Sequence, residues 1–146
     1  MEMAIDFWAV IGAVIVAVVL GFVWYGPLFG KQWMRLVGIS HEQMEDAKRR
    51  GMAGMWRTYL MMIVGTLVMA YVLAHVIAAF GEALGESIGG TGATAGLWMW
   101  LGFVAPVTLG SVLWENRPWK YWFIVSGYYL VSLVLMGIII ASGGDF

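Results

Sequence analysis

Hydrophobic residues along this chain are gathered into four long blocks separated by short polar segments. The blocks cover residues 7–26, 59–80, 93–113 and 121–141, and none of them contains aspartate, glutamate, lysine or arginine. A helix needs about 20 residues to cross the roughly 30 Å hydrocarbon core of a bilayer. The blocks do not alternate in polarity, and a lone strand would leave its backbone unpaired in lipid. The pattern therefore predicts an all-α fold, an integral membrane four-helix bundle in a single transmembrane domain.

Basic residues are confined to two of the segments that flank or separate these blocks. Six belong to the first connection and are candidate contacts for lipid headgroups: Lys31, Arg35, Lys48, Arg49, Arg50 and Arg57. The other two, Arg117 and Lys120, belong to the third connection, whereas the remaining segments carry only acids. The positive-inside rule therefore places the first and third connections in the cytoplasm and both termini outside.

The first connection has the pattern of a helix that lies on the membrane surface. Ser40 and Gln43, three residues apart, form a capping-box signature. Apolar or small residues then share one face at helical spacing: Met44, Ala47, Gly51 and Met55. Two acid-to-base pairs stand four residues apart: Glu45 with Arg49 and Asp46 with Arg50. We predict a short amphipathic cytoplasmic helix at about 40–57, with a docking helix for a cytoplasmic partner as the alternative.

Aromatic residues gather at the predicted ends of the spans, where amphipathic rings prefer the headgroup level. The cytoplasmic ends hold Trp24, Tyr25, Trp56, Tyr59, Trp114, Trp119, Tyr121 and Trp122, and the outer ends hold Trp8, Trp98 and Trp100. We interpret them as anchoring belts, with aromatic ligand binding as the alternative. Between the second and third spans, the glycine-rich stretch 81–92 predicts a flexible external loop.

Composition limits the chemistry that this chain can perform. Of its residues 62% are hydrophobic and only 12% are charged, whereas a soluble domain carries about a quarter charged residues. There is no cysteine, and the two histidines lie far apart in the sequence. No pair of acidic residues lies in the spans, so the sequence offers no cluster of metal ligands and no catalytic dyad or triad. We expect no enzymatic activity, no metal and no cofactor, and partners that include membrane lipids but no nucleic acid.

His75 is the candidate polar residue inside a span, on the same helical face as Tyr71. It is either a neutral histidine hydrogen-bonded between helices, or a proton-sensitive or ligand-binding residue. Pro106 lies inside the third span and cannot donate to the carbonyl of Gly102, which leaves an acceptor free near Thr108 and Ser111. We predict a static kink there, with a gating hinge as the alternative.

The third connection places an acid and two bases among tryptophans, over residues 114–120. A structural turn tied by an ion pair between Glu115 and either Arg117 or Arg57 is one interpretation of this segment. The other is a site for a lipid headgroup or another anion, and Glu115 with Arg117 would also be the place for any activity at the inner face.

Small residues recur every four positions along two of the spans. The first span has Ala9, Ala13, Ala17 and Gly21, and the second has Thr66, Ala70, Ala74 and Ala78. Such stripes let helix backbones approach closely in a membrane. We predict a homo-oligomer, with a dimer favoured, because four spans enclose little interior. Packing of the two stripes against each other within one chain is the alternative.

Several motifs resemble those of a family of small bacterial membrane proteins known as domain of unknown function 1761. The longest is the segment 21–31, GFVWYGPLFGK, and the likeness continues through 70–75, 102–106 and 114–120. The resemblance covers nearly the whole chain and implies a multi-pass protein of the bacterial inner membrane with four spans. The family has no established activity, so it implies no catalytic or binding residues.

Two functions from different classes are compatible with these observations. One is an oligomeric transporter or channel-like subunit for a small molecule, motivated by Pro106 and by polar residues in the fourth span: Ser126, Tyr128, Tyr129 and Ser132. The other is a non-catalytic module that binds lipid or a partner, motivated by the basic surface helix and the aromatic belts.

The charge distribution gives a direct test of the membrane orientation. Because the chain has no cysteine, single cysteines can be introduced at Ser40 and Ser87 without background. An impermeant thiol reagent added outside should label the variant at Ser87, and the variant at Ser40 should react only from the inside. The reverse labelling pattern would overturn the predicted orientation.

Overall fold

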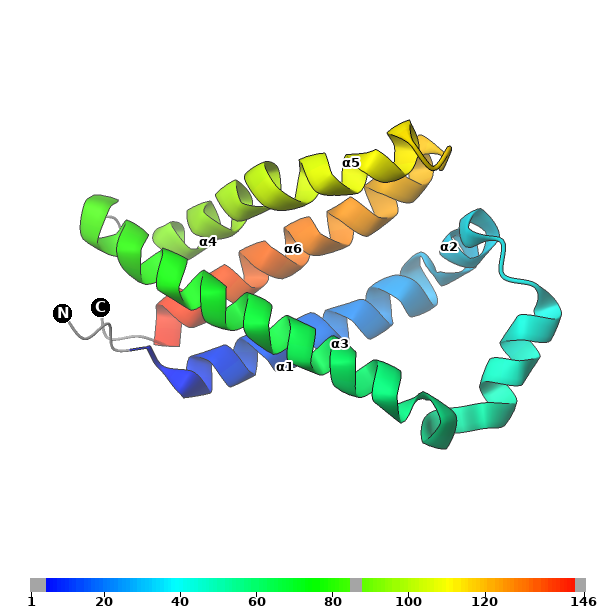
Figure 1. Ribbon diagram of the computed structural model, residues 1–146. Coiled ribbons are helices and arrows are strands. Elements are labelled where there is room, and N and C mark those ends of the chain that lie inside the picture. Colours follow the sequence, from blue (N-terminus) through cyan, green and yellow to red (C-terminus); the bar gives the residue numbers. More distant parts are fainter. Residues whose placement is uncertain (1–4, 85–87, 144–146) are drawn as a thin grey trace.

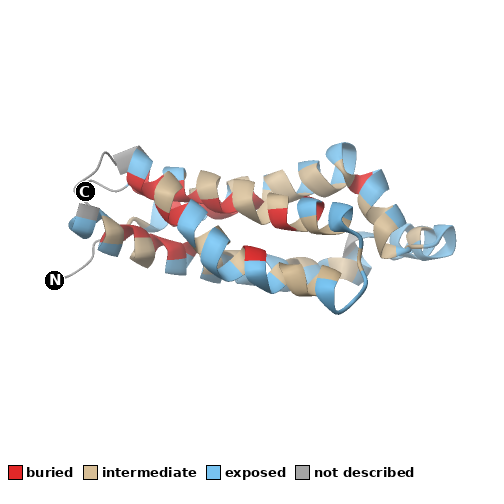
Figure 2. Cartoon of the chain, turned by 90° about the horizontal axis from the view of Figure 1, so that it is seen from above, coloured by how far each residue is buried: buried red, intermediate tan, exposed pale blue. Residues whose placement is uncertain are grey.

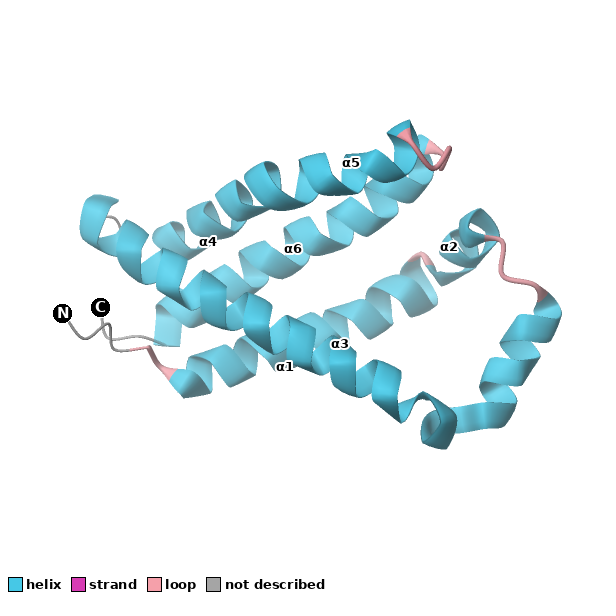
Figure 3. Ribbon diagram, viewed as in Figure 1, coloured by secondary structure: helices cyan, strands magenta, loops and turns pink. Residues whose placement is uncertain are grey.

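The computed structural model describes residues 5–84 and 88–143, and the regular structure in this part is entirely helical (Figures 1 and 3). The elements in chain order are α1 (Phe7–Val23), the π-helical segment η1 (Trp24–Leu28), α2 (Gly30–Val37), α3 (His41–Leu84), α4 (Ile88–Met99), the π-helical segment η2 (Trp100–Val104), α5 (Ala105–Leu113) and α6 (Trp119–Gly143).

Four helical stretches are long and apolar enough to cross a membrane: Phe7–Leu28, Ala53–Ala83, Gly90–Leu113 and Trp119–Gly143. Each contains one of the four predicted blocks and extends it by a few residues. The all-helical prediction and the number of membrane-length helices are therefore confirmed within the described residues. The chain has the architecture of a multi-pass membrane protein.

The helix α6 lies at the centre of the bundle and contacts each of the other α-helices. On one side it runs along α4 and α5, on the other it packs on α1, and α3 crosses the bundle obliquely (Figure 1). The start of α1, the end of α3, the start of α4 and the end of α6 lie at one end, which we call the terminal end (Figure 1). The helix α2 and the turn 114–118 lie at the opposite end, which we call the basic end (Figure 1).

The closest helix contact joins α4 to α6 and depends on glycine. A Cβ atom at Gly92 would collide with the backbone carbonyl of Gly137, and one at Gly96 would collide with that of Leu133. Gly92 and Gly96 lie one turn apart, so both face α6. Without side chains between them the two backbones come into direct contact, which is how small residues join helices in membranes.

Both predicted stripes of small residues are used inside the chain. Ala13, Ala17, Ala70 and Ala74 are at most 1% exposed and belong to one core cluster with residues of α4 and α6. Buried residues are gathered mostly toward the terminal end (Figure 2). Packing within one chain, the alternative interpretation, thus accounts for these alanines. The stripes give no support to self-association, and the homo-oligomer stays a prediction.

The first connection holds two short helices where the sequence predicts one: α2, and the segment 41–50 at the start of α3. The helix α2 was not predicted, although the capping box after it is confirmed: the backbone N–H of Ser40 donates to Oε1 of Gln43 at 3.1 Å, and that of Gln43 to Oγ of Ser40 at 3.2 Å. The predicted end at residue 57 is wrong. Gly51 has φ 56° and ψ −161°, conformations that glycine adopts readily, and it breaks α3 before the span begins.

The predicted flexible loop at 81–92 is also wrong over most of its length. The helix α3 continues through Leu84, and α4 begins at Ile88, while residues 85–87 lie outside the described part of the chain. Glycine lowers helix propensity by only about 1 kcal/mol, and tertiary contacts override it. Here Gly92 belongs to α4 because its missing side chain admits the backbone of α6.

The contact between α4 and α6 predicts a large difference between two glycine-to-alanine changes. Gly137→Ala should lower the free energy of unfolding by about 1–3 kcal/mol, because the new Cβ must push apart two packed backbones. Gly81→Ala is the matched control, since nothing lies within 4 Å of a Cβ at Gly81, and it should be neutral or stabilising. Unfolding in mixed micelles titrated with sodium dodecyl sulfate, followed by circular dichroism, measures both. Equal stability of the two variants would contradict this packing.

Candidate functional site

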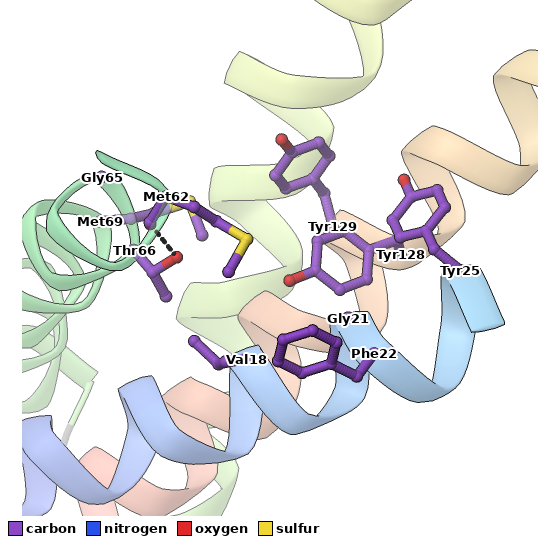
Figure 4. A pocket seen from close by; sticks show the side chains of 10 residues that line it. All are labelled: Val18, Gly21, Phe22, Tyr25, Met62, Gly65, Thr66, Met69, Tyr128 and Tyr129. Atoms are coloured by element: carbon purple, nitrogen blue, oxygen red, sulfur yellow. Dashed lines mark hydrogen bonds between the residues drawn. The ribbon is translucent and has the colours of Figure 1, made fainter. Parts of the chain in front are cut away.

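A pocket of about 560 Å³ lies where α1, α3 and α6 separate toward the basic end (Figure 4). The α3 wall holds Met62, Gly65, Thr66 and Met69. The α1 and η1 side holds Val18, Gly21, Phe22 and Tyr25, and α6 adds Tyr128 and Tyr129. The three tyrosines lie opposite α3 in this view. They form the polar part of a cavity whose other walls are mostly apolar.

The pocket begins where the small-residue packing of α1 and α3 ends. The alanines of the two stripes are buried, but the last members toward the basic end, Gly21 and Thr66, line the pocket. Nothing lies within 4 Å of a Cβ atom at Gly65, so the α3 wall is open at this point. The part of α3 nearer the basic end is therefore separated from α1 and α6 instead of packing on them.

Tyr128 is held in place across the bundle. Its hydroxyl donates a hydrogen bond to the backbone carbonyl of Ala17 at 3.0 Å, which joins α6 to α1. Its ring centroid lies 5.4 Å from that of Tyr25, 5.2 Å from that of Tyr129 and 6.4 Å from that of Trp24. Rings at these separations contact each other favourably, so the tyrosines form a continuous aromatic wall.

The polar groups of the pocket are uncharged. No lining residue carries a formal charge. Thr66 donates its hydroxyl proton to the carbonyl of Met62 at 2.8 Å and keeps lone pairs free. In the described part of the chain, the hydroxyls of Tyr25 and Tyr129 make no hydrogen bond. An apolar cavity of this size with a few hydroxyls is typical of a small-molecule site.

Three tryptophans join α6 to neighbouring helical segments. The indole N–H of Trp24 donates to the carbonyl of Ile124 at 2.9 Å, and that of Trp100 to the carbonyl of Ser126 at 2.8 Å. Trp122 donates to the carbonyl of Ala105 at 3.4 Å. These residues therefore join helices, and their role as anchoring belts stays a prediction. A tryptophan in apolar surroundings usually finds an acceptor, but the sequence does not identify which one.

The candidate residues His75, Tyr71 and Pro106 of the second and third spans do not line the pocket. The predicted hydrogen bond from His75 to another helix is wrong: Nδ1 lies 2.9 Å from the carbonyl of Tyr71, one turn earlier in α3, and the two rings stack edge to face at 4.5 Å. The partner of Nδ1 is therefore a carbonyl of its own helix. Pro106 lies in the first turn of α5, directly after the π-helical segment η2, and the static kink stays a prediction.

The hydroxyls beyond Pro106 bond to other acceptors than the Gly102 carbonyl. Thr108 donates to the carbonyl of Val104 at 2.7 Å, and Ser111 donates to the carbonyl of Thr108 at 2.7 Å. These bonds join each hydroxyl to a carbonyl three or four residues earlier in the chain, a pattern that often bends helices. The gating hinge stays a prediction.

The predicted ion pairs of Glu115 are wrong as well. Arg117 instead donates from Nη1 to the carbonyl of Leu36 at 3.3 Å, and its guanidinium lies 5.5 Å from the ring centroid of Tyr121. Glu115 is exposed, where a pair would gain little. The ion pair found among the described residues joins Glu45 and Arg49 at 4.0 Å, as predicted. The six candidate headgroup contacts are exposed side chains, and their role stays a prediction.

The fold and the pocket together define a small all-helical protein with four membrane-length helices and an uncharged cavity among them. The described residues contain no group of three or more histidine, cysteine or acidic side chains that could hold a metal ion. The chain belongs to the family described as protein of unknown function DUF1761, whose family model matches residues 8–141. No curated protein and no solved structure gives a significant match.

The bond from Tyr128 to Ala17 predicts unequal effects of two conservative changes. Tyr128→Phe should cost about 0.6 kcal/mol of stability, the average for a hydrogen bond between membrane helices, because the carbonyl of Ala17 loses its extra donor. Tyr129→Phe is the matched control and should leave stability unchanged, since its hydroxyl has no partner among the described residues. Reversible unfolding of the two variants in the same detergent gives the comparison. A larger loss from the Tyr129 change would show that the tyrosine wall is held differently.

Proposed function

We propose that this protein binds a neutral lipophilic molecule of the membrane in the pocket between α1, α3 and α6. The observation that carries the proposal is an uncharged, largely apolar cavity that holds the free hydroxyls of Tyr25 and Tyr129. Such a site suits a ligand with a long apolar body and one group that hydrogen-bonds with a phenol. We infer a binding module without enzymatic activity.

The electrostatics of the pocket favour a neutral ligand over a cation. Removing an ion from water costs several kcal/mol, even after the protein relaxes around it. Cation–π contact with the tyrosine rings would offset only about 0.5–2 kcal/mol of this cost. No carboxylate lines the pocket to offset the remainder. A neutral molecule has no such cost and gains from burying its apolar surface.

Entry from the lipid side is supported by exposure of the pocket rim. Phe22, Met62 and Gly65 line the pocket and are also exposed on the surface of the bundle. In a membrane these residues would face acyl chains, so a lipophilic molecule would reach the tyrosines without crossing water. The pocket requires an apolar ligand, and the bilayer contains molecules of this kind.

Retention of the ligand is better supported than its passage across the membrane. Toward the terminal end the space between α1 and α3 is filled by alanines that are at most 1% exposed: Ala13, Ala17, Ala70 and Ala74. A path from the pocket to that end would require these helices to separate. We therefore favour a lipid-binding module over an oligomeric transporter subunit.

The same proposal assigns the protein to a particular membrane and gives it an orientation in that membrane. The charge distribution supports both termini outside, with α2, the helix segment 41–50 and the turn 114–118 in the cytoplasm. The resemblance to small bacterial membrane proteins supports the bacterial inner membrane. The exposed basic side chains of the basic end would then face anionic headgroups of the cytoplasmic leaflet.

A pair of photoreactive probes tests the pocket and its charge preference. Both probes carry the same diazirine-bearing hydrocarbon chain, and one ends in a hydroxyl group while the other ends in trimethylammonium. In lipid nanodiscs, the hydroxyl probe should label pocket residues of the wild-type protein, mapped by mass spectrometry of peptides, and the cationic probe should not. Tyr129→Phe should weaken binding of the hydroxyl probe about two- to tenfold by removing one hydrogen bond.

Filling the pocket provides the control for nonspecific labelling. Gly65→Leu places a side chain at a position that lines the cavity, where nothing lies within 4 Å of the added Cβ atom, and should abolish most of the labelling. Gly81→Leu adds the same side chain to α3 at a distant open position and should leave labelling intact. Labelling that is unchanged by Gly65→Leu, or that is stronger with the cationic probe, would refute the proposed function.

A further inference from the structure

A second cavity, which we call the α2–α6 groove, lies at the basic end and has a volume of about 460 Å³. Trp24, Phe29 and Gln32 form one wall, and Trp119, Lys120 and Phe123 belong to the opposite wall on α6. The groove shares no lining residue with the tyrosine pocket. Its occupant can therefore differ from that of the pocket.

The two walls of the groove are fixed to each other. The indole of Trp24 is bonded to the carbonyl of Ile124, and its ring centroid lies 4.9 Å from that of Phe29, so η1 is fastened to α6 beside the start of α2. At the other end of α2, Arg117 bonds the carbonyl of Leu36. The groove is therefore held open by contacts on both sides and is not a chance gap between side chains.

Gly127 lines the groove and lets the ring of Trp24 lie close to α6. A Cβ atom at this position would lie 3.3 Å from the ring of Trp24, closer than most such contacts. Along the rest of the groove, rings of Phe29 and Phe123 present apolar surface. A hydrocarbon chain fits this lining, since it needs contact area and no hydrogen bonds.

The polar edge of the groove is basic. Lys120 is an exposed lining residue, and the amide of Gln32 lies on the opposite wall. The lining contains no acidic side chain, and α2 adds Lys31 and Arg35 within one turn of Gln32. An apolar groove with an ammonium group on one wall and an amide on the other matches an amphiphile whose head is anionic.

We propose that the α2–α6 groove holds one anionic phospholipid of the leaflet at the basic end. Its acyl chain lies along Phe29, Phe123 and Gly127, and its phosphate faces Lys120 and Gln32. A zwitterionic lipid would fill the same apolar groove, but its quaternary ammonium would add no attraction to Lys120. The groove therefore selects lipid by headgroup charge, and the selection does not depend on the tyrosine pocket.

Competition between two phospholipids tests this selection. The full-length protein is equilibrated in micelles with equal amounts of phosphatidylglycerol and phosphatidylcholine that carry the same acyl chains, and native mass spectrometry counts the lipids retained. Wild-type protein should retain phosphatidylglycerol preferentially, and Lys120→Gln should lower the preference about fivefold by removing one surface ammonium. Lys120→Arg should restore it.

Lys48→Gln is the matched control, since it removes an equally exposed ammonium from the helix segment 41–50, outside the groove lining. It should leave the preference unchanged. Three results would overturn the proposal: equal retention of both lipids by the wild-type protein, a preference that survives Lys120→Gln, or an equal loss in the Lys48 variant. The last would assign the effect to the basic surface as a whole.

Discussion

The direct contact between the backbones of α4 and α6 is the constraint on which the rest of this structure depends. Hydrophobic burial cannot decide which faces of these helices meet, because acyl chains are as apolar as the helices themselves. The faces that meet are set by three glycines that have no side chain where the two backbones touch: Gly92, Gly96 and Gly137. With α4 placed on one side of α6, α1 packs on the other side, and α3 closes over the terminal end.

Tight packing at the terminal end also accounts for the cavities at the basic end. The alanines of α1 and α3 bring these helices together at the terminal end, and the helices separate where the stripes reach Gly21 and Thr66. Aromatic side chains span the wider part of the bundle, and two of them, Trp24 and Tyr128, donate to backbone carbonyls of neighbouring helices. What remains is an uncharged pocket on one side and the basic α2–α6 groove on the other.

The sequence could predict the features that depend on neighbours in the chain. The four apolar blocks, the Ser40–Gln43 capping box and the Glu45–Arg49 pair are all present. Predictions about contacts between residues far apart in the sequence were less accurate. His75 bonds within its own helix instead of to another, and Arg117 bonds the carbonyl of Leu36, 81 residues away, instead of Glu115. Periodicity identifies a polar or small face, but not what lies against it.

The sequence by itself determined that this chain forms four membrane-length helices, because length and the absence of charge follow directly from residue order. It also identified Tyr128 and Tyr129 as polar residues of the fourth span. Only the tertiary structure decided that they face Tyr25 and the open side of α3, and that the glycines of the predicted loop join α4 to α6. The reason is physical: crossing a membrane is a property of each helix alone, whereas a cavity is left where several helices fail to fill the space between them.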